Sequence, residues 1–344
     1  MMIDVSLCCD RNMLEQAYVT IKSVKDSSSQ GNEFCFNIVR EAETSESEIR
    51  LFSGLEDKKT KINFFNINNY VSKQEKKAFA VLGYPFTAAS YRIFLPKIIS
   101  DNVKKTIYLD CDLIVRKDLH ELWTQPLNGH ILSAVKDFGV VYHIIKNDIK
   151  HKESIALKKL NLIKPENYFN SGVLLCNLDK MRKENFISKC LRVLSQQKNM
   201  IYLDQDLLNI VCNGDLQILD ANWNVITEFT NMKKDLLENL SSSDRHSFTD
   251  SLRTPAIIHY AGPIKPWEST EIALSSYWWQ TARFTPFYEQ ILMKSTRNLI
   301  KESKFILWSL KLHYLFIKLL KTVTGANRFD KKTKQLKKLL KIFR

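Results

Sequence analysis

The stretch T-I-Y-L-D-C-D-L-I-V, from Thr106 to Val115, decides how the rest of the chain is interpreted. It is an apolar run interrupted by two carboxylates, Asp110 and Asp112, which lie one residue apart. In an extended chain successive side chains alternate, so we expect both carboxylates on one side of a single strand and Cys111 on the other. Two close carboxylates repel each other and are costly to bury, so a cation or a strand end open to water must accommodate them. A metal ion is the economical explanation.

The first part of the chain alternates between strand and helix patterns. Apolar runs predict strands at residues 3–9, Phe34–Val39 and Lys61–Ile67. Between them, helical spacing predicts one helix from Leu14 to Val24 and another after Thr44–Glu48, with Ile49 and Phe52 on its apolar face. This alternation predicts an α/β fold with a largely parallel sheet, helices on both faces and ligands beyond the carboxyl ends of the strands. The chain has no G-x-G-x-x-G or G-x-x-x-x-G-K motif, which argues against a dinucleotide or P-loop site.

The middle of the chain continues this pattern. An apolar helix with Arg92 in its middle, a polar excursion at residues 136–168 and several further elements are expected. We expect the excursion, which is Lys-rich and weakly periodic, to be mobile and to cover the site. The predicted helices are Phe86–Leu95, Asp118–Trp123, Asp179–Gln196 and one that opens at Leu203, and the predicted strands are Ile131–Val135, Phe169–Leu178, Leu216–Leu219 and Pro255–Tyr260.

The composition is that of a globular protein with a full core. Of the 344 residues, 44% are hydrophobic and 26% are charged. The seven cysteines are odd in number, lie mostly in apolar segments and form no C-x-x-C pair. They are typical of reduced, buried cysteines in an intracellular protein.

The net charge of +14 is concentrated at the C-terminal end. Residues 294–344 hold 15 Lys and Arg but only two acidic residues, so the rest of the chain is nearly neutral. A near-neutral body argues against a nucleic-acid-binding protein. Within the basic tail, the apolar segment Phe305–Leu320 is too short and too charged to span a bilayer. After a turn at Gly325–Asn327, a last helix is expected with Leu336, Leu339, Leu340 and Phe343 on its apolar face.

Several polar residues at strand ends are candidates for a site, and each has an ordinary structural alternative. Asp110 and Asp112 can hold a divalent cation or simply face solvent. His259 ends a separate strand, where it is either a satisfied structural histidine or the nitrogen ligand that completes an oxygen, oxygen and nitrogen set. Lys265, in a Pro-bounded loop, is either an exposed lysine or a cation for a phosphate.

Two further polar groups have the same ambiguity. Asp204-Gln205-Asp206 opens a helix, where the carboxylates either stabilise the helix dipole or form part of a site. Asn170, before Gly172, is typical of a turn residue when it is considered alone.

Taken together in their order, these residues resemble the retaining glycosyltransferases of family 8, in particular the bacterial lipopolysaccharide galactosyl- and glucosyltransferases, which have a GT-A fold. The resemblance covers about residues 3–285, and H-Y-A-G-P-I-K-P-W is nearly diagnostic of the family. It is carried by C-C-D-R-N (8–12), S-Y-R (90–92), Y-L-D-C-D (108–112), K-D (136–137), F-N-S-G-V (169–173), D-Q-D (204–206) and H-Y-A-G-P-I-K-P-W (259–267).

The resemblance implies a role for each matching residue. It implies that the end of the first strand binds uridine, through Cys8, Asp10 and Asn12. It implies that Asp110, Asp112 and His259 bind Mn²⁺, or Mg²⁺ in its place, and that Gly262 and Lys265 hold the diphosphate. It implies that the donor sugar is surrounded by Arg92, Asp137, Asn170, Asp204 and Gln205, of which Gln205 and Asp204 are the candidates for catalysis. The position after Asn12 is Met13, where relatives often have an aromatic residue over the uracil, so stacking is not expected there.

The implied activity is Mn²⁺-dependent transfer of a hexose from UDP-galactose or UDP-glucose to a lipopolysaccharide or another cell-surface saccharide, with an α linkage. We expect residues 1–285 to form a catalytic GT-A domain with a Rossmann-like mixed sheet, and residues 286–344 to form a basic helical extension. Its apolar and basic faces predict association with an anionic membrane surface, on the cytoplasmic side of the inner membrane. The alternatives are a glycogenin-like or protein-glycan glycosyltransferase and, in another class, a basic nucleic-acid-binding or adaptor protein with a degenerate site.

Overall fold

The structure is a computed structural model that describes residues 1–29, 31–41, 43–80, 85–146, 152–197, 200–269, 271–324 and 333–337. The chain divides into two compact units. The first comprises Met1–Pro266 and Thr270–Pro286, and the second comprises Trp267–Ser269 and Phe287–Arg344.

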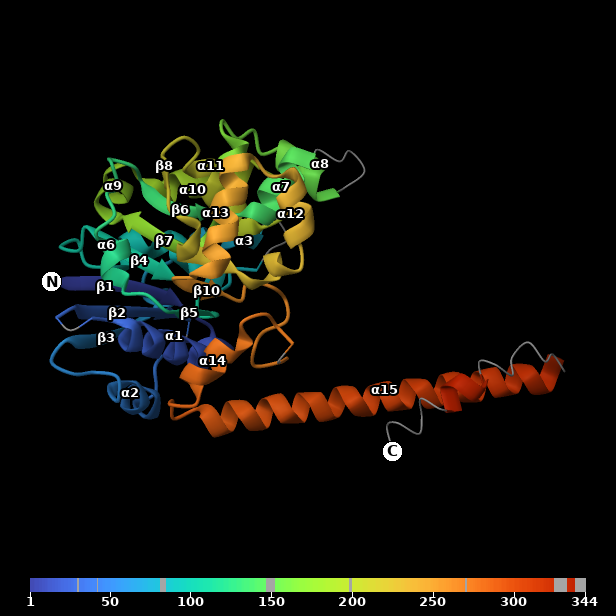
Figure 1. Ribbon diagram of the computed structural model, residues 1–344. Coiled ribbons are helices and arrows are strands. Elements are labelled where there is room, and N and C mark those ends of the chain that lie inside the picture. Colours follow the sequence, from blue (N-terminus) through green and yellow to red (C-terminus); the bar gives the residue numbers. More distant parts are fainter. Residues whose placement is uncertain are drawn as a thin grey trace. The chain divides into compact units, whose positions relative to one another are not determined.

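The first unit is built on a mixed sheet with the strand order β3-β2-β1-β4-β7-β6-β8 (Figure 1). Strands β1, β2, β3 and β4 are mutually parallel, and β7 runs antiparallel to both of its neighbours, β4 and β6. The predicted largely parallel α/β sheet is therefore confirmed, with one reversed strand in it. The strands are β1 (Met2–Cys8), β2 (Glu33–Arg40), β3 (Thr60–Asn66), β4 (Lys105–Leu109), β6 (Leu132–Lys136), β7 (Phe169–Asn177) and β8 (Leu216–Ile218).

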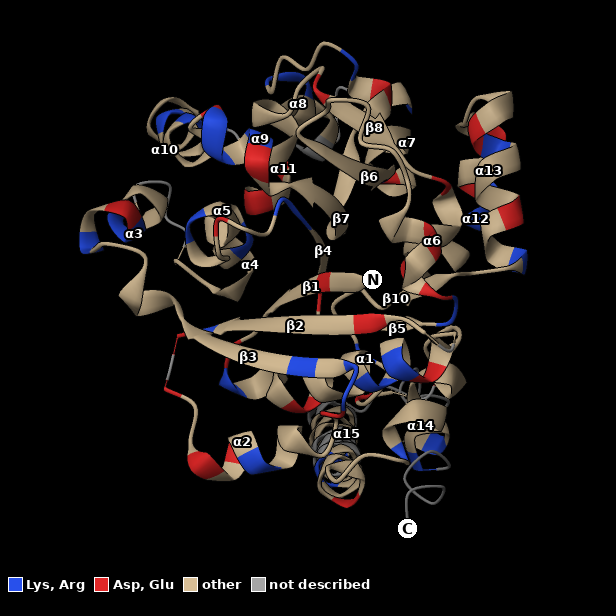
Figure 2. Cartoon of the chain, turned by 90° about the vertical axis from the view of Figure 1, so that its left-hand side faces the viewer, with Lys and Arg blue, Asp and Glu red and all other residues tan. Residues whose placement is uncertain are grey.

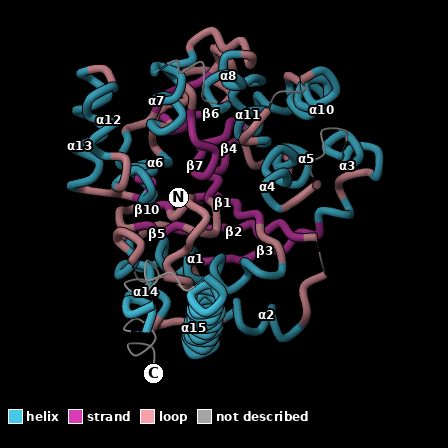
Figure 3. The backbone as a smooth tube through the Cα atoms, turned by 90° about the vertical axis from the view of Figure 1, so that its right-hand side faces the viewer, coloured by secondary structure: helices cyan, strands magenta, loops and turns pink. Residues whose placement is uncertain are grey.

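Helices cover both faces of this sheet, as predicted. Figure 3 shows α1 and α2 on one face of β2 and β3, and α4 and α5 on the opposite side. The central strands β4 and β7 are buried on both faces, and Val5, Ser6 and Leu7 of β1 are all fully buried. The α-helices of the unit are α1 (Leu14–Ser27), α2 (Glu46–Ser53), α3 (Lys73–Ala80), α4 (Ala88–Tyr91), α5 (Leu95–Ile98), α6 (Leu119–Trp123), α7 (Phe138–Lys146), α8 (Lys152–Lys158), α9 (Leu178–Lys183), α10 (Phe186–Gln196), α11 (Leu203–Val211), α12 (Lys233–Asn239), α13 (Ser242–Arg253) and α14 (Ser275–Ala282).

The stretch Thr106–Val115 is not one strand, which corrects the prediction. It leaves the large sheet after Leu109 and enters a second, three-stranded sheet as β5 (Leu113–Val115), in the order β5-β10-β9. The other two strands are β9 (Val225–Ile226) and β10 (Ile257–His259). Asp110 and Asp112 therefore lie in the connection between two sheets, and simple alternation does not determine their directions.

Three other predictions of secondary structure need correction. The helix expected at Phe86–Leu95 is broken into α4, a 3-10 helix at Arg92–Phe94, and α5, which has a proline in its first turn. The helix expected at Asp179–Gln196 breaks between α9 and α10 because Asn185 adopts a left-handed backbone with φ of 52°. Ile49 does not belong to the apolar face of α2, since it is 48% exposed whereas Phe52 is buried.

The predicted mobile excursion at residues 136–168 is largely helical. It forms α7 and α8, and residues 147–151 lie outside the described part of the chain. Asp137 Oδ1 accepts the N–H of Val140, as an N-cap residue does, and Val140 and Val141 are buried in the core. The apolar run F-G-V-V-Y after Asp137 therefore decides the local structure, in spite of the lysines around it.

All seven cysteines are free, and six of them are buried, as predicted. Lys/Arg and Asp/Glu are interspersed over the helices of the first unit in Figure 2, which agrees with the near-neutral charge of this part of the sequence.

The second unit consists mainly of α15 (Tyr288–Thr324), a continuous helix of 37 residues (Figure 1). The predicted turn at Gly325–Asn327 and the residues Leu339, Leu340 and Phe343 of the expected last helix lie outside the described residues. Within the part of the chain that the structure describes, no helix combines the length and the apolar character that crossing a membrane requires.

Candidate functional site

Asp110, Asp112 and His259 come together at the junction of the two sheets. His259 Nε2 lies 3.2 Å from Asp112 Oδ1 and 3.8 Å from Asp110 Oδ2, and one ligand atom from each residue falls within 4.8 Å of the others. The β-ladder produces this juxtaposition, because His259 pairs with Leu113 across β10 and β5, and Tyr260 donates its N–H to the Asp112 carbonyl oxygen.

These three side chains fit a small divalent cation. Ligands at about 2.1 Å from an octahedral ion lie about 3 Å apart when they are adjacent. The separation of His259 from Asp112, 3.2 Å, is close to this value, and that from Asp110, 3.8 Å, is larger. Two carboxylates and one neutral imidazole form a donor set suited to Mn²⁺ or Mg²⁺. Figure 1 shows β5 and β10, the strands on either side of this cluster, lying next to each other.

Different cations balance the two carboxylates. Arg92 Nη2 lies 2.9 Å from Asp110 Oδ1, which also accepts the hydroxyl of Tyr108 at 2.6 Å. Lys265 Nζ lies 2.6 Å from Asp112 Oδ2. Burial alone would raise the pKa of Asp112, but its contacts with His259 and Lys265 lower it well below its ordinary value. Asp112 is therefore ionised at neutral pH, as a metal ligand must be.

Arg92 is a buried cation that joins the metal cluster to α11. Its Nη1 donates to the Ser171 carbonyl oxygen at 2.5 Å, and its Nε lies 3.3 Å from Asp204 Oδ2. The guanidinium carbon also lies 4.5 Å from the centre of the Tyr108 ring. Because one guanidinium contacts both Asp110 and Asp204, Arg92 determines the separation of these two acids.

Gln205 is held by a saturated hydrogen-bond network. Its Nε2 donates to Asp137 Oδ2 at 3.1 Å and to the Tyr168 hydroxyl at 3.3 Å. Its Oε1 accepts from Asn170 Nδ2 at 2.9 Å and from the backbone N–H of Ser171 at 3.2 Å. A glutamine amide has two donor hydrogens and two acceptor positions, and all four are used here. Asn170 is thus part of a buried network in β7, and the alternative of a turn residue is wrong.

The carboxylates of the D-Q-D motif lie in different environments. Burial raises the pKa of Asp204 to about 6, although Arg92 opposes the shift. Asp206 Oδ2 accepts the backbone N–H groups of Ile201 and Tyr202 at 2.6 and 2.8 Å, and so holds the start of α11, where Leu203 has a φ of 36°. Asp206 thus stabilises a helix start, whereas Asp204 faces Arg92.

The residues predicted to bind the nucleotide lie at the ends of strands. Cys8 ends β1 and is buried, and Asp10 Oδ1 accepts the backbone N–H groups of Asn12 and Met13 at 2.8 and 3.0 Å. In the loop after β10, Lys265 Nζ donates to the Tyr260 carbonyl oxygen at 2.8 Å. A Cβ added at Gly262 in this loop would lie 3.4 Å from Glu228 Oε2.

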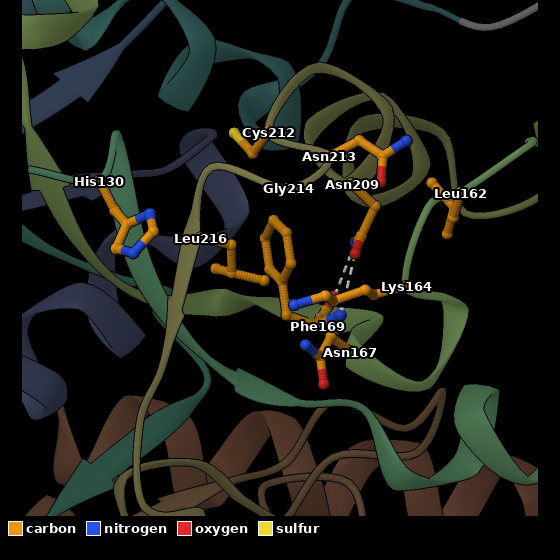
Figure 4. A pocket seen from close by; sticks show the side chains of 10 residues that line it. All are labelled: His130, Leu162, Lys164, Asn167, Phe169, Asn209, Cys212, Asn213, Gly214 and Leu216. Atoms are coloured by element: carbon orange, nitrogen blue, oxygen red, sulfur yellow. Dashed lines mark hydrogen bonds between the residues drawn. The ribbon is translucent and has the colours of Figure 1, made fainter.

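The structure also contains a cavity of about 180 Å³ that lies apart from these residues (Figure 4). Figure 4 shows the Phe169 ring pointing into it, and two dashed lines that join Asn209 to the backbone of Phe169. None of the metal-cluster residues lines this cavity. No carboxylate is among the described residues that line this cavity, whereas the cluster brings two carboxylates and an imidazole together, so the cluster is the better functional candidate.

Three polar residues of this region were not identified in the sequence. Tyr108, Tyr168 and Asn224 contact Asp110, Gln205 and His259, respectively. Tyr108 lies within the motif Y-L-D-C-D (108–112), and Tyr168 directly precedes F-N-S-G-V (169–173), so the nearby motifs were the available signal. Asn224 follows the buried Trp223 and has no motif around it, so the sequence alone does not distinguish it from other asparagines.

Comparison with known proteins places this arrangement in a family. A model of the family described as "Glycosyl transferase family 8" matches residues 4–271. The chain belongs to this family. Among solved structures, this family 8 glycosyltransferase is similar to the bifunctional glycosyltransferase WbbM, with a TM-score of 0.74 and 24% identity over 86% of this chain and 51% of the other. It is also similar to the galactosyltransferase LgtC in complex with donor and acceptor sugar analogs, with a TM-score of 0.66 and 24% identity over 83% and 96% of the two chains. The predicted GT-A type of fold is thereby confirmed.

Curated proteins of similar sequence include two that are named as lipopolysaccharide glycosyltransferases. General stress protein A of Bacillus subtilis is 31% identical over 186 residues, which cover 53% of this chain and 59% of that protein. A lipopolysaccharide 1,2-glucosyltransferase of Escherichia coli is 26% identical over 317 residues, covering 88% and 87%. The lipopolysaccharide 1,3-galactosyltransferase of Salmonella typhimurium is 26% identical over 209 residues, covering 58% and 55%. The chain thus spans less than two thirds of the length of the Bacillus and Salmonella proteins.

Proposed function

We propose that this family 8 glycosyltransferase transfers a hexose, galactose or glucose, from a UDP-sugar to a lipopolysaccharide or another cell-surface saccharide, with retention of configuration and an α linkage. The observation that carries the proposal is the cluster of Asp110, Asp112 and His259 with Lys265 beside it. The names of the lipopolysaccharide glucosyl- and galactosyltransferases among its relatives support both the class of acceptor and the two donor sugars.

In this proposal residues 1–285 are the catalytic domain, and each part of the site contacts a different part of the donor. Cys8, Asp10 and Asn12 bind the uridine. Gly262 allows the loop backbone to approach the diphosphate, and Lys265 neutralises part of its charge. The sugar is surrounded by Arg92, Asp137, Asn170, Asp204 and Gln205.

Asp110, Asp112 and His259 would hold the divalent cation, Mn²⁺ or Mg²⁺. A bound cation would act as a Lewis acid that stabilises negative charge on the departing diphosphate. The ammonium of Lys265 lies 2.6 Å from Asp112 Oδ2, so it is within reach of the same oxygens. The cation that the two carboxylates would hold and the ammonium of Lys265 would therefore both place positive charge near the bond that breaks.

Retention of configuration requires either a covalent intermediate or attack from the face of the leaving group. The Gln205 amide is a poor nucleophile, and its four hydrogen-bonding positions are already used within the protein. We therefore favour same-face attack, in which a diphosphate oxygen accepts the proton of the acceptor hydroxyl. Asp204 is the alternative nucleophile, but it lies 3.3 Å from Arg92 Nε. Trapping of a glycosyl adduct on Asp204 would refute same-face attack.

The second unit is proposed to associate with an anionic membrane surface that presents a lipid-linked acceptor. Apolar side chains recur on α15 at helical spacing and are 46–60% exposed, namely Trp308, Leu312, Leu315, Phe316 and Leu319. Lys311 and Lys318 lie between these apolar residues in the sequence. Such a helix lies in the interface of a bilayer, with its apolar side in the acyl boundary and its cations near the headgroups. The triple variant W308S/L315S/L319S should lose binding to anionic liposomes, and unchanged binding would refute the association.

The activity is tested by incubation of the protein with a panel of UDP-sugars, with Mn²⁺ or with EDTA, and measurement of released UDP. We expect Mn²⁺-dependent hydrolysis of UDP-galactose or UDP-glucose that is lost in Asp112→Asn. Asp179→Asn is the matched control, since Asp179 pairs with surface lysines. If no UDP-sugar is hydrolysed or bound, or if Asp112→Asn is as active as Asp179→Asn, the proposed function is wrong.

A further inference from the structure

An unbroken chain of hydrogen bonds connects His259 to Gln205. His259 Nδ1 lies 2.9 Å from Asn224 Oδ1, and Asn224 Nδ2 lies 2.8 Å from Asn170 Oδ1. Asn170 Nδ2 then donates to Gln205 Oε1 at 2.9 Å. All four side chains are buried, with exposed fractions between 2% and 8%. Of these four residues, only Asn224 has no role in the proposed function.

Two backbone N–H groups determine the direction of every bond in the chain. The N–H of Gly172 donates to one amide atom of Asn170 at 2.9 Å, so this atom is the oxygen Oδ1. The N–H of Ser171 likewise identifies the oxygen of Gln205, at 3.2 Å. A backbone N–H is always a donor, so neither amide can be turned over without placing two donors face to face.

The same reasoning extends to Asn224 and then to the imidazole. Because Asn170 presents an oxygen, the Asn224 atom that faces it must be the donor Nδ2. The atom that faces His259 is then Asn224 Oδ1, an acceptor, so His259 Nδ1 must carry a hydrogen. In a neutral imidazole this leaves the lone pair on Nε2, which faces Asp112 Oδ1 at 3.2 Å. Two acceptors then face each other, and a cation between them would satisfy both.

We infer that Asn224 is a positioning residue that fixes His259 as the tautomer with hydrogen on Nδ1, so that Nε2 can bind a divalent cation, and that it joins this ligand to the Asn170–Gln205 network. The inference rests on the proposed function, since it concerns a ligand of the proposed metal site. Partners that orient a metal-binding histidine typically change the metal affinity by about 10- to 100-fold when they are removed.

The backbone around Asn224 keeps it in place. Asn224 ends the 3-10 helix Ala221–Asn224 and directly precedes β9, whose residues Val225 and Ile226 pair with Ile258 and His259 of β10. The amide of Asn224 is thus carried by a strand that is hydrogen-bonded to the strand of His259. Exposed fractions of 4% for Asn224 and 2% for His259 leave little access for water as a substitute partner.

Two substitutions distinguish the effect of Asn224 on His259 from its effect on Asn170. Asn224→Leu removes both hydrogen bonds at similar volume. Asn224→Asp keeps an oxygen for His259 Nδ1–H, but it cannot donate to Asn170, whose oxygen cannot turn away because Gly172 N–H binds it. The Leu variant should therefore affect the tautomer and the metal affinity, whereas the Asp variant should affect only the side of the donor sugar.

The tautomer is measured directly by ¹H–¹⁵N correlation spectra of protein labelled with ¹⁵N-histidine, without metal, at a pH of about 8.5, about two units above the ordinary pKa of a histidine side chain. The signal of His259 among the seven histidines is identified by its loss in His259→Gln. Wild type and Asn224→Asp should show the hydrogen on Nδ1, and Asn224→Leu should show a substantial fraction with hydrogen on Nε2. Asn224→Ala serves in its place if the Leu variant does not fold.

Calorimetric titration with Mn²⁺ in the presence of UDP completes the test. Asn224→Leu should bind Mn²⁺ about 10- to 100-fold more weakly, and Asn224→Asp should bind it at least as tightly as wild type. At saturating Mn²⁺, hydrolysis of the donor by Asn224→Asp should still fall by about 10-fold or more because Asn170 has lost its partner. An unchanged tautomer and affinity in the Leu variant would overturn the inference, and so would an equal loss of affinity in the Leu and Asp variants.

The variants Asp110→Asn and His259→Gln distinguish this inference from the proposed function. If they abolish Mn²⁺ binding and Asn224→Leu binds Mn²⁺ as tightly as the wild type, only the role of Asn224 is wrong. If they leave Mn²⁺ binding intact, the proposed metal site itself is wrong.

Discussion

Gly172→Ala should disable the metal cluster by adding one methyl group. A Cβ on Gly172 would lie 2.2 Å from His259 Cε1 and 2.8 Å from Asp110 Oδ2. Ordinary contact begins at 3.4 Å, so the imidazole or the strand would have to shift by about 1.2 Å. Neither neighbour can yield easily, because Asn224 holds His259 at 2.9 Å and Arg92 holds Asp110 at 2.9 Å.

The expected loss follows from the size of this shift. Ligand distances in a metal site are tolerated within about 0.2 Å, and a misplacement of about 1 Å typically costs about 100-fold. We therefore expect Mn²⁺ affinity in the presence of UDP to fall by about 100-fold or more, which corresponds to about 2.7 kcal/mol. Overpacking should also lower the free energy of unfolding by about 1–3 kcal/mol. The backbone of Gly172 contributes no strain, since its φ is not positive.

The assay is calorimetric titration of Mn²⁺ into protein with saturating UDP, combined with urea unfolding of the same samples. Gly54→Ala is the matched control, because Gly54 has a φ of −64° at the end of α2, and the nearest neighbour of its added Cβ is 3.3 Å away. It should bind Mn²⁺ like the wild type. If the Mn²⁺ affinity of Gly172→Ala lies within about threefold of that of the control, the close packing of His259 against β7 does not determine the affinity, and the prediction is wrong.

Three further outcomes are expected. Lys265→Ala should weaken UDP binding by about 10-fold or more, measured by competition calorimetry, whereas Asp112 should still bind Mn²⁺ in the absence of nucleotide. Equal losses of the UDP and Mn²⁺ affinities would contradict a role of Lys265 at the diphosphate. Burial raises the pKa of Asp204 from 3.8 to about 6. The contribution of this group to the free energy of unfolding is therefore fully present below pH 3.8, and up to about 3 kcal/mol of it is lost as the pH rises through 6. Asp204→Asn should therefore gain free energy of unfolding relative to wild type between pH 5 and 7 in urea titrations, and a flat difference would show that Arg92 compensates fully. Asp206→Ala should lower the free energy of unfolding by about 1–3 kcal/mol, because the backbone N–H groups of Ile201 and Tyr202 and the Tyr168 hydroxyl would lose their acceptor. Unchanged urea midpoints would refute its role at the start of α11.

The sequence was sufficient for those parts of the structure that depend on local pattern. The strands β1, β2 and β3 and the helix α1 match their predictions closely, because apolar runs and helical spacing are both local signals. The meeting of Asp110 and Asp112 with His259 was expected from the family resemblance and not from local pattern, since it depends on the pairing of β10 with β5.

The break in the stretch Thr106–Val115 could not be predicted from local pattern. Both halves of the stretch are buried apolar strands, so one long strand and two short strands would show the same apolar pattern in the sequence. The difference is made by β10, which is distant in sequence and pairs with β5 from Leu113 to Val115. Strand partners at such a separation carry no signal in the stretch itself. The helix α7 was missed for the opposite reason, because the lysines around it obscured a short apolar run.

The reversed strand β7 explains why the site could be recognised by residue type but not by geometry. Three consecutive residues of β7 serve three separate purposes. The side chain of Asn170 joins the amide network, the backbone of Ser171 binds both Arg92 and Gln205, and the missing side chain of Gly172 leaves room for His259. Two of these contributions come from the backbone or from an absent side chain, so they do not depend on chemically distinctive residue types. The same backbone N–H groups orient Asn224, which explains how a residue without any motif can complete the site.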